Sequence, residues 1–128
     1  MHVIDTSLWI EDLVGSALGQ KVKIEIAQIE KNVVPTLVQH ELFKWLCRNR
    51  SREDAENVIA FTMTCQVVPL GTGLALRASD LAREFRLHAS DAIIYATALH
   101  LGADLLTCDA HFEGLAQVRY MTKRESPA

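Results

Sequence analysis

Short apolar runs alternate along the chain with longer segments in which apolar residues recur every three or four positions. The short runs predict buried strands, and the longer segments predict helices. The predicted strands are residues 2–4, 33–35, 66–69, 104–107 and 117–120. Short strands separated by helices are typical of a parallel sheet with helices on both faces. The pattern therefore predicts an α/β fold in three α/β/α layers, with a short parallel sheet of about five strands.

Helix starts and one ambiguous segment complete the pattern. Hydroxyl residues that can cap helices stand at the predicted starts: Thr6, Ser7, Thr36, Ser51 and Thr72. Residues 22–26 alternate as in a strand, but apolar residues over 20–32 also recur at helical spacing. The longer pattern favours a helix over 20–32, preceded by a loop over 15–19, and a strand stays the alternative for 22–26.

A predicted buried helix and the buried strand after it each carry an acid. Residues 92–99 are apolar or small almost all round, which is typical of a helix without a solvent-exposed face, and Gly102 marks its end. Asp91 stands at the start of this helix, and Asp109 lies just past the strand that follows. Ionised carboxylates in such places are costly unless they are paired, so they predict a cation site.

Composition narrows the class of protein. The chain has 128 residues, enough for one domain, and we expect a single domain over 1–128 with 123–128 as a frayed tail. The net charge of −3 gives no overall basic field for nucleic acid or membrane, although a local basic patch stays possible. We find no apolar run near the ~20 residues of a membrane span, no secretion signal and no zinc-type cysteine spacing. These features predict a cytoplasmic protein that does not bind membranes.

Two further acids are predicted at the same edge of the sheet. Asp5 follows the first strand, and Glu41 lies in the second turn of the helix after the second strand. Ligands of parallel α/β sheets bind beyond the carboxyl ends of the strands, where Asp91 and Asp109 are also predicted. Each acid alone could be a cap, a turn residue or a solvated side chain, but the four together repel by roughly 1–4 kcal/mol per pair. A hard divalent ion, Mg²⁺ or Mn²⁺, relieves this repulsion. Hydroxyls suited to orienting the acids stand beside them: Thr6, Ser7 and Thr107.

These pieces, in this order, resemble the PIN-domain family and, within it, the VapC-type toxins of bacterial toxin–antitoxin pairs. The matching stretches are residues 4–7 (IDTS), 41–42 (EL), 90–98 (SDAIIYATA) and 106–109 (LTCD), with Phe112 after them. The resemblance covers nearly the whole chain and includes all four acids. It implies a PIN-like fold, helix for the ambiguous segment, and a metal-dependent endoribonuclease that hydrolyses phosphodiester bonds in RNA.

The resemblance also implies partners and roles. Asp5, Asp91 and Asp109 are expected to bind Mg²⁺ or Mn²⁺, and Glu41 is expected to hold a metal-bound water or act as a weak general base. The implied partner is a cognate antitoxin protein, in a homodimer or in a heterotetramer or larger assembly. Lys44 and Arg48 are expected to contact RNA, with a solvated helix face as the alternative. Leu8, Trp9 and Leu13 are expected to form one wall of the antitoxin groove. Four of the five histidines are not spaced as metal ligands usually are: His40, His88, His100 and His111. They are interpreted as surface residues or as core residues whose hydrogen bonds are satisfied.

Two other functions stay open, namely a PIN-like RNA-processing nuclease without an antitoxin and a non-catalytic PIN module that binds RNA or protein. Two unrelated α/β classes are disfavoured. A signalling receiver domain needs an acidic pair after its first strand, where Thr6 follows Asp5. A haloacid-dehalogenase-type phosphatase needs a second Asp two positions after the first, where Ser7 stands.

Overall fold

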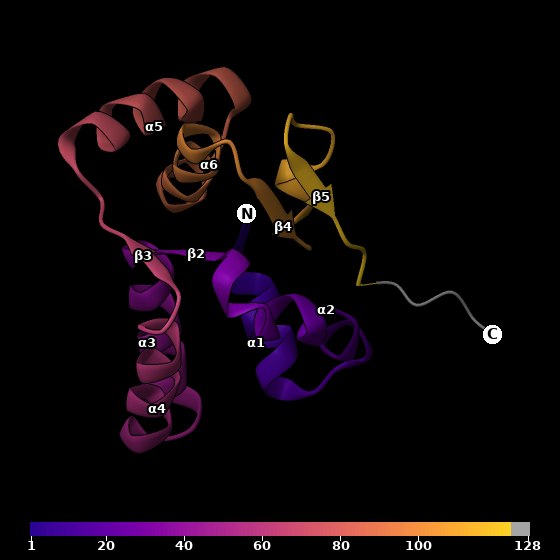
Figure 1. Ribbon diagram of the computed structural model, residues 1–128. Helices are drawn as coiled ribbons and strands as arrows, with labels where there is room; N and C mark the ends of the chain where they lie inside the picture. The colour runs from indigo at the N-terminus through magenta and orange to yellow at the C-terminus, as the bar shows by residue number, and fades with distance from the viewer. Residues whose placement is uncertain (124–128) are drawn as a thin grey trace.

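Five short strands form one parallel sheet through the middle of the molecule (Figure 1). In the computed structural model, which describes residues 1–123, the strands are β1 (His2–Ile4), β2 (Asn32–Pro35), β3 (Gln66–Val68), β4 (Asp104–Thr107) and β5 (Val118–Tyr120). Their spatial order is β3-β2-β1-β4-β5, and every neighbouring pair is parallel. The predicted α/β fold is confirmed, whereas all but Lys123 of the tail predicted to fray lies outside the described residues.

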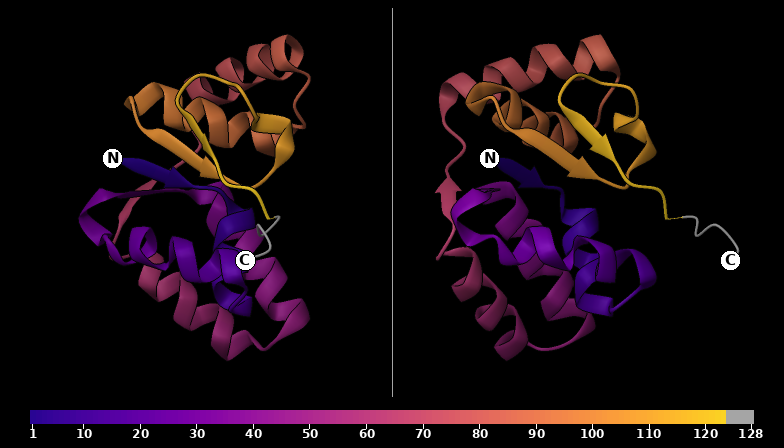
Figure 2. Two further views of the ribbon diagram at one scale, coloured as in Figure 1. Left: turned by 90° about the vertical axis from the view of Figure 1, so that its right-hand side faces the viewer. Right: turned by 45° about the vertical axis from the view of Figure 1, so that its right-hand side comes forward.

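Helices cover both faces of this sheet. They are α1 (Thr6–Val14), α2 (Ala17–Ala27), α3 (Thr36–Asn49), α4 (Arg52–Thr62), α5 (Thr72–Phe85) and α6 (Ala89–Leu101), with 3-10 turns η1 (Ile29–Lys31) and η2 (Ala110–Phe112). Figures 1 and 2 show α1–α4 on one face and α5 and α6 on the other. The predicted buried helix is α6, which ends at Gly102 in the left-handed conformation. No helix in the described part of the chain has the length and apolarity needed to span a bilayer.

The first helical layer differs from the sequence prediction at its second helix. The predicted loop over 15–19 contains the start of α2, because Ser16 Oγ accepts a hydrogen bond from Gly19 N–H at 2.9 Å and caps the helix. Gly19 lies inside α2, and a Cβ there would stand 2.0 Å from the Glu11 carbonyl oxygen. Residues 22–26 are helical, but the helix ends at Ala27 rather than continuing to residue 32.

The predicted helix caps are only partly found. Ser51 caps α4 by accepting a hydrogen bond from Asp54 N–H at 3.0 Å. Thr36 Oγ1 instead accepts from Leu70 N–H at 3.2 Å, and Thr72 is the first residue of α5 rather than its cap. Hydroxyl residues near a helix start therefore have other partners here, and two of them contact the predicted acids.

Candidate active site

Four acids from four elements approach the carboxyl ends of β1 and β4. Asp5 directly follows β1, and Asp109 follows β4 after one residue. Glu41 lies in the second turn of α3, and Asp91 lies in the first turn of α6. The strand order reverses between β1 and β4, since the chain passes outward to β2 and β3 before it returns to the other side of β1. Open parallel sheets bind their ligands at such a switch point.

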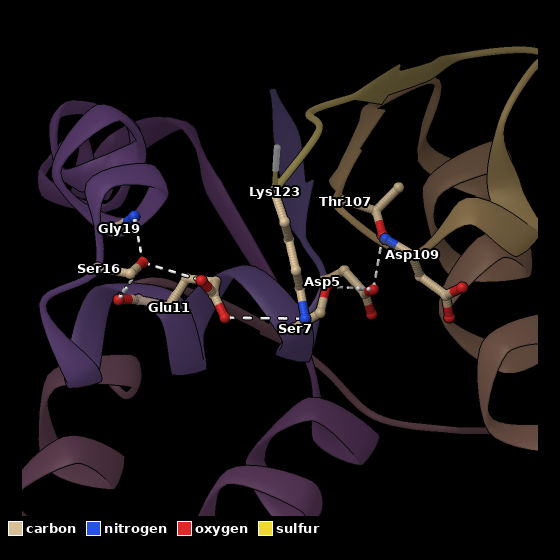
Figure 3. A network of polar contacts seen from close by, with 8 residues as sticks. All are labelled: Asp5, Ser7, Glu11, Ser16, Gly19, Thr107, Asp109 and Lys123. Atoms are coloured by element: carbon tan, nitrogen blue, oxygen red, sulfur yellow. Dashed lines mark hydrogen bonds and ion pairs between the residues drawn. The ribbon is translucent and has the colours of Figure 1, made fainter. Parts of the chain in front are cut away.

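Asp5 is the buried acid of this group, with 4% of its surface exposed. Its Oδ2 accepts hydrogen bonds from Ser7 Oγ at 2.9 Å and from Thr107 Oγ1 at 2.7 Å (Figure 3). Burial raises its pKa to about 6 despite these two bonds, and the charges of Asp91 and Glu41 add to the rise. The fold therefore holds an acid whose charge is costly and whose position is fixed.

Asp91 and Glu41 belong to the same electrostatic group. Burial is the main cause that raises the pKa of Asp91, followed by the charges of Asp109 and Glu41, while His88 and His111 oppose the rise. Thr6 Oγ1 donates a hydrogen bond to Glu41 Oε1 at 2.6 Å. The four acids are thus close enough for their charges to interact, which is the condition that favours a bound cation.

The hydroxyls of Thr6, Ser7 and Thr107 contact carboxylates, as expected of groups that orient them. Neither Thr6 nor Ser7 is the cap of α1; Asp5 occupies the cap position, and its side chain makes no capping bond. Thr107 is fully buried and also accepts a hydrogen bond from Asp109 N–H at 3.0 Å. One hydroxyl at the end of β4 therefore links the acids that follow the two adjacent strands.

A histidine that sequence interpretation passed over joins the acids. Asp91, Asp109 and His111 each offer a ligand atom within 4.8 Å of the others. His111 Nδ1 lies 2.9 Å from Asp109 Oδ1, and the same oxygen accepts a hydrogen bond from His111 N–H at 2.9 Å. His111 is exposed, in line with its interpretation as a surface histidine, but its ring also lies beside two of the acids. Its signal in the sequence is the two-residue spacing from Asp109. Carboxylate oxygens suit a hard divalent ion such as Mg²⁺ or Mn²⁺, which Asp5, Asp91 and Asp109 would hold.

A cleft of about 630 Å³ opens beside this group. Glu41 is the one of the four acids that lines it, with Thr6 and Ser90 nearby, and Lys44 and Arg48 line it from α3 as well. Both cations lie on one helix because α3 continues to Asn49. Arg52 belongs to α4 instead, where its Nε lies 3.0 Å from Glu56 Oε1. The cleft therefore brings the Glu41 carboxylate together with two cations.

A second groove of about 310 Å³ lies between α1, α2 and α4, and Trp9, Leu13, Val58 and Phe61 are among its lining residues. Leu8 does not belong to this wall, because it is fully buried in the core. Trp9 reaches the groove with only 3% of its surface exposed, and its Nε1 donates a hydrogen bond to the Ile4 carbonyl at 3.1 Å. Leu13 is the member of the predicted set that is accessible at this surface.

Several solved structures have a similar fold. A toxin–antitoxin complex from Klebsiella pneumoniae contains a chain that is 23% identical with a TM-score of 0.78, over 98% of this chain and 100% of that chain. VapC20 from Mycobacterium tuberculosis, a toxin that cleaves the sarcin-ricin loop, is 22% identical with a TM-score of 0.74, over 93% and 99% of the two chains. VapBC2 from Rickettsia felis, bound to a DNA fragment from its promoter, contains a chain that is 12% identical with a TM-score of 0.70, over 94% of this chain and 97% of that chain. These likenesses establish the shared fold.

The sequence itself gives the family. No curated protein sequence matches the chain. The family model described as PIN domain, however, matches residues 2–118, which includes all four acids and His111. Since this match spans most of the 128 residues, the chain belongs to the PIN domain family.

Proposed function

We propose that this protein is a metal-dependent endoribonuclease and the toxin of a toxin–antitoxin pair. The observation that carries the proposal is the convergence of Asp5, Glu41, Asp91 and Asp109 at the switch point of a PIN fold, where two of the acids have raised pKa values. The similarity to a toxin that cleaves the sarcin-ricin loop supports RNA as the substrate. The similarity to toxin–antitoxin complexes supports an antitoxin partner.

The acids have separate tasks in this proposal. A bound Mg²⁺ or Mn²⁺ supplies Lewis-acid stabilisation of the phosphate and a nucleophilic water at neutral pH. Asp5, Asp91 and Asp109 hold the ion, and Ser7 and Thr107 keep the Asp5 carboxylate in one orientation. Glu41 has one oxygen bonded to Thr6, which leaves the other to orient the attacking water and accept its proton.

Lys44 and Arg48 guide the RNA in this proposal. An acidic centre repels a polyanion, so the backbone needs positive charge on its way to the acids. The two cations flank the cleft that ends at Thr6 and Glu41. Phosphates bound along α3 would bring the scissile bond to the acids.

The antitoxin would bind in the groove of Trp9, Leu13 and Phe61 and reach the acids with a basic side chain in place of the metal. The groove begins on α1, the helix that directly follows Asp5, and this supports a bound peptide that extends from the groove to the acids. We propose a homodimer, or a heterotetramer or larger assembly with antitoxin, that acts in the cytoplasm, where RNA is available.

Cleavage of single-stranded RNA by the purified protein tests the proposal. We expect Mn²⁺- or Mg²⁺-dependent cleavage that EDTA stops and that Asp5→Asn and Asp91→Asn abolish. Asp80→Asn, on the exposed face of α5, is the matched control and should cleave like the parent. Undiminished cleavage by the two active-site variants, or in excess EDTA, would refute a metal nuclease. Failure to copurify with the product of a neighbouring gene would favour an RNA-processing nuclease without an antitoxin.

A further inference from the structure

We propose that His111 is a direct metal ligand and that its imidazole nitrogen makes the site prefer Mn²⁺ over Mg²⁺. The inference rests on the proposed function and names the ion that the same site selects. It begins from the position of the ring, which lies next to Asp109 and within ligand distance of Asp91.

The spacing of the donor atoms fits one ion. Two ligands at right angles around a metal with bonds of about 2.1 Å stand about 3.0 Å apart, and opposite ligands stand about 4.2 Å apart. His111 Nδ1 and Asp109 Oδ1 are 2.9 Å apart, which matches adjacent ligands. The Asp91 oxygen lies within 4.8 Å of both atoms, so small side-chain rotations would bring all three onto one ion.

The ring stands on a short, anchored turn. Asp109 caps η2 by accepting the His111 N–H, and the next residue, Phe112, is fully buried and fixes the turn to the core. The His88 ring packs edge-on against His111 with the centroids 5.7 Å apart. The His111 side chain is nevertheless 61% exposed, so it can turn towards an incoming ion without disturbing the core.

Ligand chemistry gives the preference. Mg²⁺ and Mn²⁺ both take carboxylate oxygens, but Mn²⁺, as a first-row transition ion, also binds imidazole nitrogen, which Mg²⁺ hardly does. The two carboxylates therefore serve both ions, whereas the imidazole of His111 adds affinity for Mn²⁺ and little for Mg²⁺. In the metal-free protein, Nδ1–H can donate to Asp109 Oδ1, and in the bound form that nitrogen faces the ion with the ring proton on Nε2.

A rival role for His111 is to orient Asp109 through the same short contact without touching the ion. His111→Asn separates the two roles, since the Asn amide can still donate a hydrogen bond to Asp109 but is a poor metal ligand. His100→Asn, at the far end of α6, is the matched control, and His88→Asn controls for the neighbouring ring.

The experiment measures Mn²⁺ and Mg²⁺ binding by isothermal titration calorimetry, together with nitrogen modulation of the electron spin echo of bound Mn²⁺. We expect nitrogen modulation in the parent and in both controls and its loss in His111→Asn. We also expect the Mn²⁺ affinity of His111→Asn to fall about tenfold or more, the scale that loss of even an outer partner reaches, with little change for Mg²⁺.

Three outcomes would overturn the inference. If the electron spin echo of Mn²⁺ bound to the parent protein shows no nitrogen modulation, direct ligation by His111 is refuted without any variant. The nuclease proposal would then stay intact. An unchanged Mn²⁺-to-Mg²⁺ affinity ratio in His111→Asn refutes the preference alone. Binding of neither metal by the parent refutes the metal site and, with it, the proposed function.

Discussion

The buried carboxylate of Asp5 predicts that the metal-free protein is destabilised by its own active site. Its pKa is raised from 3.8 to about 6, chiefly by burial, and this net rise already includes the opposing hydrogen bonds from Ser7 and Thr107. One pKa unit corresponds to about 1.4 kcal/mol, so the ionised carboxylate lowers the free energy of unfolding by on the order of 3 kcal/mol. Asp5→Asn keeps the shape of the side chain and removes the charge.

We therefore expect Asp5→Asn to melt higher than the parent at pH 7 in EDTA, by on the order of 10 °C at most for a chain of this size. The sign with pH follows from the raised pKa. The folded protein binds the Asp5 proton more tightly than the unfolded chain, so this stability is present below about pH 4 and is lost as pH rises to about 6. The gap between variant and parent should open over that window.

Differential scanning calorimetry of both proteins from pH 4 to 8 measures this gap. Asp80→Asn is the control, because Asp80 is exposed on α5 and its loss should change the free energy of unfolding by less than about 0.5 kcal/mol. Saturating Mn²⁺ should stabilise the parent by about 2.7 kcal/mol at a hundredfold excess over Kd and Asp5→Asn far less. An Asp5→Asn variant that melts at or below its parent in EDTA, with a gap independent of pH, would show that the carboxylate is a structural group.

Three further predictions follow from the same geometry. Asp91→Asn should also melt above the parent in EDTA, by less than Asp5→Asn because Asp91 is only half-buried, and a lower melting temperature would identify Asp91 as a helix-stabilising acid. Lys44→Ala and Arg48→Ala should each weaken RNA binding and reduce the slope of log affinity against log salt by about 0.7, as loss of one contact to a single strand does, whereas Arg83→Ala on α5 should change neither. Leu13→Ala should weaken antitoxin binding at least about fivefold, as measured by calorimetry, and an effect no larger than that of Leu76→Ala, exposed on α5, would exclude this groove.

Burial on both faces makes the sheet and α6 predictable from sequence. A central strand such as β4 has apolar residues at Leu105 and Leu106, where it packs on both faces, and α6 is apolar or small over 92–99 because it lies in the core. The start of α2 could not be predicted in this way. Gly19 has the composition of a loop residue, but it is a helical position where only the absence of a Cβ lets α2 approach Glu11. Local propensity was overridden by tertiary packing.

The hydrogen-bond partners of the side chains at the site also could not be predicted from the sequence. The positions of Asp5 and Asp109 follow from the rule that parallel strands end at one edge, but the direction of a hydroxyl does not. Thr6 and Ser7 have the pattern of caps, yet Ser7 donates to Asp5, two residues before it, and Thr6 donates to Glu41, which comes within reach only when α1 and α3 pack together. The proximity of His111 to Asp91 could not be predicted, because the two residues are distant in sequence and near only in the fold.

Hydroxyls rather than cations hold Asp5 and Glu41 in place, and this has a functional consequence. A cation in place of the Thr107 hydroxyl would neutralise the charge of Asp5 and remove the attraction for a bound ion. The hydroxyl dipoles orient the carboxylates and leave most of their negative charge uncompensated, since the pKa of Asp5 stays raised despite them. A metal ion and a basic antitoxin side chain would both be drawn to that charge. If they occupy it in turn, each must weaken the binding of the other by the same factor, so inhibition by antitoxin and activation by metal would be two uses of one electrostatic site.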